Sequence, residues 1–248
     1  LGFLQLGFDI IWANDILKDA CESYKLNIGN HIVNEDITNI NLDHLPKADL
    51  IIGGPPCQGF SGIGKRDPND KRSDLVYTYL SIVKKVQPTI FLFENVTGLK
   101  SSKMKPSDTS MITQPSLFES IEDVTINYAN QKNESNGVLE NLKKSFNQIG
   151  YRINIYTLNA ADYGVPQRRK RVFIIGNRLT IDIAPPYPTH YENSKLGKKW
   201  VSSFEAISDI QSPNMNGIVG YKYNPTNDFQ RIMRSENLTT TTLHFTPY

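Results

Sequence analysis

The chain has 248 residues, of which 39% are hydrophobic and 21% charged, and its formal net charge is +2. This composition is typical of a globular domain and excludes collagen, coiled-coil and wholly disordered chains. No apolar run approaches the roughly 18–20 residues that a membrane helix needs. Because the net charge is small, any binding of nucleic acid has to come from a local basic patch.

The first two-thirds of the chain alternates predicted strands and helices. Short apolar runs predict strands at residues 8–13, 49–52 and 89–93, and helical spacing predicts helices over residues 18–27 and 75–86. Buried strands separated by helices are typical of a parallel α/β sheet.

The pattern weakens over residues 99–137, which are rich in Ser, Asn, Asp and Thr and predict a surface insertion. A helix is predicted over residues 138–149, followed by strands at residues 151–158 and 172–176. The link between these strands is too short for a crossover helix, so the two strands should be antiparallel. Beyond residue 178, frequent Pro and Gly predict the start of a second, loop-rich domain.

The cysteine and histidine content argues against disulfides and metal. Cys21 and Cys57 are too few for a disulfide framework, and the four histidines are scattered. We therefore expect no metal site and a reducing compartment.

Residues 53–61 follow directly after a predicted strand and have the sequence Gly-Gly-Pro-Pro-Cys-Gln-Gly-Phe-Ser. Function collects at the carboxyl ends of strands in parallel sheets. The glycines allow close approach of a ligand, and the prolines stiffen the loop and fix the direction of Cys57. A cysteine held in this way suits a nucleophile, because its thiolate must be aimed and stabilised. The alternative is a structural cysteine in a tight turn.

Glu94 follows the predicted strand 89–93. A carboxylate directly after five buried residues should be partly desolvated and suited to donate a proton. The alternative is an exposed glutamate that caps the next helix.

Residues 168–171 are four cations in a row. Such a run usually forms a solvated face. Alternation along a strand would put Arg169 and Arg171 on the same side, where their guanidinium groups could grip a phosphate or a carbonyl.

Asp15 and Asp36 each lie near the end of a predicted strand. An acid in this place commonly accepts hydrogen bonds from ribose hydroxyls in dinucleotide-type folds. Alone this signal is weak, because no glycine-rich loop precedes it.

Three of these stretches, in this order, resemble the cytosine-5 DNA methyltransferase family of bacterial restriction-modification systems. Residues 54–61 are similar to its catalytic loop, residues 94–96 to its Glu-Asn-Val motif and residues 159–172 to its arginine motif. The resemblance implies an α/β, Rossmann-like class I methyltransferase fold, with a mostly parallel sheet and one antiparallel strand near the end. It places the catalytic domain at residues 1–178 and the start of a target-recognition domain at residues 179–248.

The resemblance also implies the chemistry. A methyl group would pass from S-adenosylmethionine to carbon 5 of cytosine in double-stranded DNA. Cys57 would attack carbon 6 of a flipped-out base, and Glu94 would protonate or hydrogen-bond ring N3 and the amino group. Arg169 and Arg171 would hold the base and steady Glu94.

Further site residues follow only from the resemblance. Those implied to bind the cofactor are Asp15, Ile16, Asp36, Ile37, Pro55 and Leu75. Those implied to contact the base or the DNA, or to support the loop, are Pro56, Gln58, Ser61, Asn95, Val96 and Gln167. In the loop at residues 59–74, phosphate contacts are expected from Lys65, Arg66, Lys71 and Arg72. The expected partners are double-stranded DNA and a cognate restriction endonuclease, and the protein is expected to be a monomer.

The chain departs from the family pattern in three places. The family's opening strand and Phe-x-Gly-x-Gly loop are not found before Leu1, and the recognition domain has only started by residue 242. The segment 99–137 is longer than the family's usual link.

Three other interpretations stay open. A tRNA methyltransferase of the same fold would carry Pro-Phe-Thr after Pro-Pro-Cys-Gln, where this chain has Gly59, Phe60 and Ser61. An inactive or split DNA-binding subunit would have no chemical need for an intact catalytic set. A nucleotide-binding oxidoreductase explains the two acids but leaves the other motifs unexplained.

Overall fold

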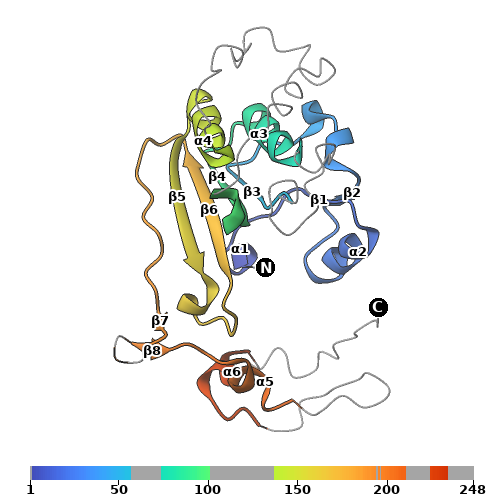
Figure 1. The fold of residues 1–248 in the computed structure, drawn as a ribbon. Helices are drawn as coiled ribbons and strands as arrows, with labels where there is room; N and C mark the ends of the chain where they lie inside the picture. Colours follow the sequence, from blue (N-terminus) through green and yellow to red (C-terminus); the bar gives the residue numbers. More distant parts are fainter. Residues whose placement is uncertain are drawn as a thin grey trace. The chain divides into compact units, whose positions relative to one another are not determined.

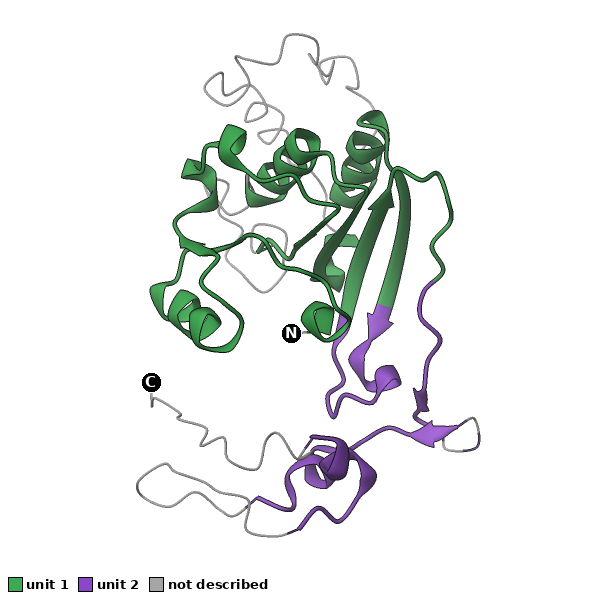
Figure 2. Ribbon diagram, turned by 180° about the vertical axis from the view of Figure 1, so that it is seen from behind, with its two compact units in different colours: residues 1–157, 171–184 green, residues 158–170, 185–248 purple. Residues whose placement is uncertain are grey.

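The structure, a computed structural model, describes residues 2–56, 74–100, 137–193, 195, 197–210 and 224–233. It divides into two compact units, one of residues 1–157 with 171–184 and one of residues 158–170 with 185–248 (Figure 2). Cys57, Gln58 and Ser61 lie outside the described residues. So do the four cations predicted to contact phosphates and nearly all of the predicted insertion.

The first unit contains the strands and helices that the alternating pattern predicts (Figure 1). The helices of this unit are α1 (Gly2–Gln5), α2 (Lys18–Asn27), α3 (Asp74–Val86) and α4 (Val138–Gln148). The strands are β1 (Ala13–Asp15), β2 (Ile32–Asn34), β3 (Leu50–Gly53), β4 (Ile90–Val96), β5 (Arg152–Asn159) and β6 (Lys170–Asn177), the last two reaching into the second unit. Short 3-10 turns occupy Ile37–Asn39, Leu42–His44 and Thr97–Lys100.

The strands form two sheets with mixed directions. β1 and β2 are parallel, and a second sheet has the order β3-β4-β6-β5. In it β3 and β4 are parallel, whereas β4 and β6 are antiparallel. Figure 1 shows β5 and β6 as neighbours that run in opposite directions. The predicted α/β fold, with an antiparallel strand near its end, is confirmed.

Most element boundaries follow the sequence pattern closely, but strand β6 is longer than predicted, and two further differences stand out. The apolar run at residues 8–12 does not form the predicted strand, and Phe8 packs edge-on against Phe3 at 5.3 Å between ring centroids. Strand β4 extends three residues beyond the prediction, because residues 94–96 continue the pairing with β6.

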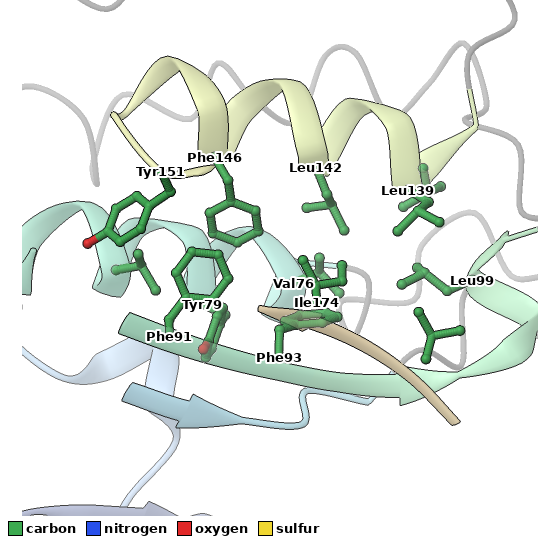
Figure 3. Close-up of a cluster of buried hydrophobic side chains, with 13 residues drawn as sticks. Val76, Tyr79, Phe91, Phe93, Leu99, Leu139, Leu142, Phe146, Tyr151 and Ile174 are labelled. Atoms are coloured by element: carbon green, nitrogen blue, oxygen red, sulfur yellow. The ribbon is translucent and has the colours of Figure 1, made fainter. Parts of the chain in front are cut away.

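The hydrophobic core lies between this sheet and the helices α3 and α4 (Figure 3). Phe91 and Phe93 of β4 are fully buried there, and Phe91 lies 4.3 Å from Phe146 of α4 between ring centroids. Burial alternates along β4, so the predicted run of five buried residues is wrong. Because alternate residues face opposite sides of a sheet, Glu94 lies on the face away from this core.

The second unit has only short elements. They are a 3-10 turn at Ala160–Tyr163, a parallel pair of strands β7 (His190–Tyr191) and β8 (Lys198–Lys199), and the helices α5 (Ser203–Ile207) and α6 (Asp228–Met233). Helix α5 begins with a capping box, in which Ser202 and Glu205 each bond the other's backbone N–H. None of the described helices is long and apolar enough to cross a membrane.

Candidate active site

The end of β3 packs closely against α3 and β4. A Cβ atom added to Gly53 would lie 2.4 Å from the ring of Tyr79, so a larger residue would push this strand end away. The Tyr79 hydroxyl donates to the carbonyl of Leu92 on β4 at 3.1 Å, and burial raises its pKa, which keeps it a neutral donor. The start of the predicted catalytic loop is therefore fixed by core packing.

Gly54, the residue after the end of β3, lies beside Glu94. A Cβ atom on Gly54 would lie 3.3 Å from the Glu94 Oε2 atom and 3.7 Å from the Glu94 carbonyl oxygen. The backbone leaving β3 thus passes directly over the Glu94 carboxylate. A glycine here lets the loop approach the carboxylate without pressing a side chain on it.

Asn95 ties the same loop to β4. Its Nδ2 donates to the carbonyl of Pro55 at 3.0 Å, and its Oδ1 accepts from the backbone N–H of Val96 at 2.8 Å. The side chain is 4% exposed. Because a buried amide must satisfy its polar atoms, Asn95 fixes the Pro55 carbonyl two residues before Cys57.

Arg171 holds the Glu94 carboxylate from the neighbouring strand. Its Nε lies 3.0 Å from Glu94 Oε1, with the two side chains 22% and 36% exposed. Arg171 pairs with Val96 in the β4–β6 register, so it is a diagonal neighbour of Glu94 on one face of the sheet. A half-buried ion pair of this kind gives the carboxylate a definite direction.

The run of four cations does not behave as one solvated face. Arg168 pairs with Glu192 at 2.8 Å and lies 4.8 Å from the centre of the Trp200 ring. Arg171 pairs with Glu94, and both of these residues belong to the first unit. Arg169 is exposed, and its guanidinium makes no hydrogen bond or ion pair with any residue that the structure describes. That Arg169 and Arg171 grip one group together stays a prediction.

The turn before β6 has a defined backbone. Gly164 has φ +86°, which favours glycine, and a Cβ there would lie 2.8 Å from the His190 ring. The exposed Gln167 follows, with its N–H donating to the Val165 carbonyl at 2.7 Å. The Arg169 N–H donates to Asn159 Oδ1 at 3.1 Å, so this backbone is held where the arginine begins.

The carboxyl ends of β1 and β2 carry the two predicted cofactor acids. Asp15 Oδ1 accepts from the N–H of Leu17 at 2.8 Å, at the entry to α2. Asp36 Oδ1 accepts from the N–H and hydroxyl of Thr38 at 2.9 and 2.8 Å. Since the two strands are parallel, both acids lie at the same edge of the sheet.

The backbone at this edge is fastened by an asparagine that sequence reasoning missed. Asn34 Nδ2 donates to the carbonyls of Asp15 and Ile16, at 3.1 and 3.0 Å. Ile16 itself is 62% exposed, and Ile37 is half-buried. Carboxylates beside apolar side chains match the chemistry of a nucleoside, which presents ribose hydroxyls and a flat base.

No group of three or more His, Cys, Asp and Glu side chains among the described residues could hold a metal ion. Of the remaining predicted residues, Leu75 is half-buried in the first turn of α3, and Pro56 is exposed just after Pro55.

Comparison with known families decides which kind of protein carries this site. The family model for C-5 cytosine-specific DNA methylases matches residues 1–121 and 128–245. The chain belongs to this family. The unmatched residues between these two segments, 122–127, lie inside the predicted insertion.

Among the curated relatives of this family member are type II methyltransferases. M.FnuDI of Fusobacterium nucleatum is 36% identical over 231 residues, which are 92% of this chain and 56% of the relative. M.NgoFVII of Neisseria gonorrhoeae is 36% identical over 216 residues, 85% of this chain and 50% of the relative. The chain thus spans about half the length of these relatives.

Solved structures support the fold. A putative DNA modification methyltransferase encoded within an E. coli prophage has a TM-score of 0.55 and 23% identity, covering 91% of this chain and 57% of that one. The Dnmt2 methyltransferase of S. pombe has a TM-score of 0.51 and 23% identity, covering 74% and 48%. The chain has the Rossmann-like methyltransferase fold of these proteins.

Sequence reasoning missed three residues around the arginine turn, namely Asn159, Asp162 and Trp200. The first two lie inside the arginine motif, and Trp200 is one of only two tryptophans in the sequence. Nothing in their spacing indicated that they would meet.

Proposed function

We propose that the full-length protein transfers a methyl group from S-adenosylmethionine to carbon 5 of cytosine in double-stranded DNA. One observation carries this proposal beyond family membership. The root of the Cys57 loop, at Gly54 and Pro55, lies against Glu94 and Asn95. The backbone that leads to the proposed nucleophile thus starts beside the proposed proton donor, which supports a joint role in attack on a base.

The proposed chemistry assigns a bond or a proton to each group. The Cys57 thiolate attacks carbon 6 of a flipped-out cytosine, and the ring electrons move toward N3. Glu94 donates a proton or hydrogen bond to N3 and the amino group, so that negative charge does not build on the ring. Loss of the carbon 5 proton later expels the Cys57 sulfur and restores the aromatic ring.

Arginines orient the acid and the base in this scheme. Arg171 steadies Glu94 through the 3.0 Å contact, and Arg169 reaches from the neighbouring turn to hold the base. The residues proposed to shape the loop or contact the base and DNA are Pro56, Gln58, Ser61, Asn95, Val96 and Gln167.

The edge formed by β1 and β2 is the proposed place for the cofactor. Asp15 and Asp36 accept hydrogen bonds from hydroxyls, while Ile16, Ile37, Pro55 and Leu75 provide apolar contact. S-adenosylmethionine, when bound, supplies the electrophilic methyl group that carbon 5 accepts. Loss of that methyl group would leave S-adenosylhomocysteine with a neutral sulfur, and the chain's own residues would only orient the cofactor.

The proposed function is accompanied by proposals for the domain bounds, oligomeric state, location and partners of the enzyme. We place the catalytic domain at residues 1–178 and the start of the target-recognition domain at residues 179–248. The proposed enzyme is a monomer in the bacterial cytoplasm, with double-stranded DNA as substrate and a cognate restriction endonuclease as its functional partner.

Trapping the covalent adduct tests the proposal. Full-length enzyme is incubated with S-adenosylmethionine and duplex DNA that carries 5-fluorocytosine at sites mapped by bisulfite sequencing. Fluorine at carbon 5 leaves no proton to remove, so a denaturation-resistant complex should accumulate. Cys57→Ala should form no complex and no methylcytosine, while Cys21→Ser, at the other cysteine, should still be trapped.

Two outcomes would count against this function. A Cys57→Ala enzyme that still methylates would remove the proposed nucleophile. Methylation of tRNA with none of duplex DNA would favour the tRNA enzyme instead.

A further inference from the structure

A polar cluster of the second unit surrounds the indole of Trp200. Its Nε1 donates to Asp162 Oδ1 at 2.9 Å. The guanidinium of Arg168 lies over the ring, 4.8 Å from its centre, and pairs with Glu192 at 2.8 Å. The backbone of Asp162 is also tied down, because its carbonyl accepts from the N–H of Thr189 at 2.9 Å. Trp200 is half-buried and is surrounded by polar partners rather than by the hydrophobic core.

This cluster continues to the backbone of Arg169. Asp162 Oδ1 also accepts a longer hydrogen bond from Asn159 Nδ2, at 3.5 Å. The other end of that amide, Asn159 Oδ1, accepts from the Arg169 N–H at 3.1 Å. Because an amide has one donor end and one acceptor end, the bond to Asp162 selects the orientation in which Asn159 receives Arg169.

Arg168 contacts the face of the same indole ring. Its guanidinium is engaged by the Trp200 ring and by Glu192, while Arg169, the next residue, presents an exposed guanidinium. The turn is therefore held at two adjacent residues, one through its side chain and one through its backbone. Because the backbone of this turn is held in this way, the Arg169 side chain extends from a fixed position.

We propose that Trp200 is a positioning residue for methyl transfer, which acts through Asp162 and Asn159 to fix the backbone from which Arg169 reaches the base. The inference rests on the proposed function, since that function gives Arg169 its task. A fixed backbone position for Arg169 matters because small displacements of a group that contacts the reacting molecule reduce the reaction rate more than the binding affinity.

A double-mutant cycle on the full-length enzyme separates this role from a structural one. Trp200→Phe keeps a ring beneath Arg168 but removes the N–H that Asp162 accepts. We expect it to lower the single-turnover rate of DNA methylation about tenfold, the size of one lost charge-assisted hydrogen bond, with DNA affinity within about twofold. In an Arg169→Ala background the same change should cost less than about twofold, because the residue through which it acts is gone.

Variants of Asp162 and a matched control sharpen the test. Asp162→Asn keeps an oxygen acceptor and should stay within about threefold of the parent rate, whereas Asp162→Ala should match Trp200→Phe. Tyr191→Phe removes another side-chain hydrogen bond of the same unit, the 3.1 Å bond to the Pro188 carbonyl, and should leave the rate unchanged in both backgrounds. If Trp200→Phe does not fold, as judged by circular dichroism, the Asp162 pair decides.

The outcomes distinguish the two proposals. Equal losses from Trp200→Phe with and without Arg169, or no loss in the parent, overturn the positioning role alone. An Arg169→Ala enzyme with full activity also overturns it. A parent enzyme that methylates no cytosine overturns the proposed function, and the positioning role with it.

Discussion

Three features of the structure restrain the Glu94 side chain. Arg171 holds Oε1, the backbone at Gly54 passes close to Oε2, and alternation along β4 turns the side chain away from the core. A carboxylate restrained in this way keeps one orientation toward a bound base. Its proposed task as hydrogen-bond and proton donor is therefore separable from any part in DNA binding.

Replacing Glu94 with glutamine tests that separation. Glu94→Gln keeps the size of the side chain but cannot give up a proton, so the methylation rate should fall by about 10²–10³. DNA affinity should stay within a few-fold, because the contact to Arg171 can still be made by an amide oxygen. Single-turnover kinetics and a binding titration measure the two quantities.

Glu140→Gln provides the control, since Glu140 is exposed on α4 in the same unit. It should change neither quantity. Equal losses of rate and affinity in Glu94→Gln would instead assign Glu94 a structural part.

Strand β6 packs closely against the core at Gly176. A Cβ atom on Gly176 would lie 2.1 Å from the ring of Phe91, which is itself packed between Phe146 at 4.3 Å and Tyr151 at 5.1 Å. Because the interior is closely packed, the fully buried Phe91 ring has little room to move aside without displacing those rings. The register that places Arg171 beside Glu94 thus depends on a residue with no side chain.

Gly176→Ala should therefore destabilise the protein by about 1–3 kcal/mol through overpacking. Urea unfolding of the full-length protein measures the change. Gly98→Ala is a matched control, because among the described residues its Cβ would meet only Val96, at an ordinary 3.9 Å. Equal stabilities of the two variants would contradict the close packing of β6 on Phe91.

At the scale of the whole molecule, charge is local rather than global. The net charge of +2 gives no indication of a nucleic-acid substrate, yet residues 59–74 contain four closely spaced cations, Lys65, Arg66, Lys71 and Arg72. Contacts of such residues with phosphate release counterions, so they make DNA affinity steeply dependent on salt.

A plot of log affinity against log salt concentration has a negative slope. Replacing these four residues with alanine should make that slope shallower by about three to four. The slope is measured with duplex DNA that lacks methylation sites, to isolate the contribution of the backbone. Lys143 and Lys144 of α4, in the first unit, serve as a control of equal charge type, and their loss should leave the slope nearly unchanged. An unaltered slope in the fourfold variant would remove this loop from the phosphate contacts.

The sequence by itself determined the local elements and the family. Helical periodicity predicted Lys18–Asn27 to the residue, because repeats of this kind reflect backbone geometry that is set within a few turns. The motifs around Cys57, Glu94 and Arg169 identified the family before any contact was known. These signals are local or simply ordered along the chain.

Only the tertiary structure decided which of these residues meet. That Arg171, rather than Arg168, pairs with Glu94 depends on the register between β4 and β6, and that register depends on core packing at Gly176. Likewise, Asn95 reaches Pro55 and Trp200 reaches Asp162 across long stretches of chain. Such contacts are set by how strands and turns pack, which no local pattern of residues encodes.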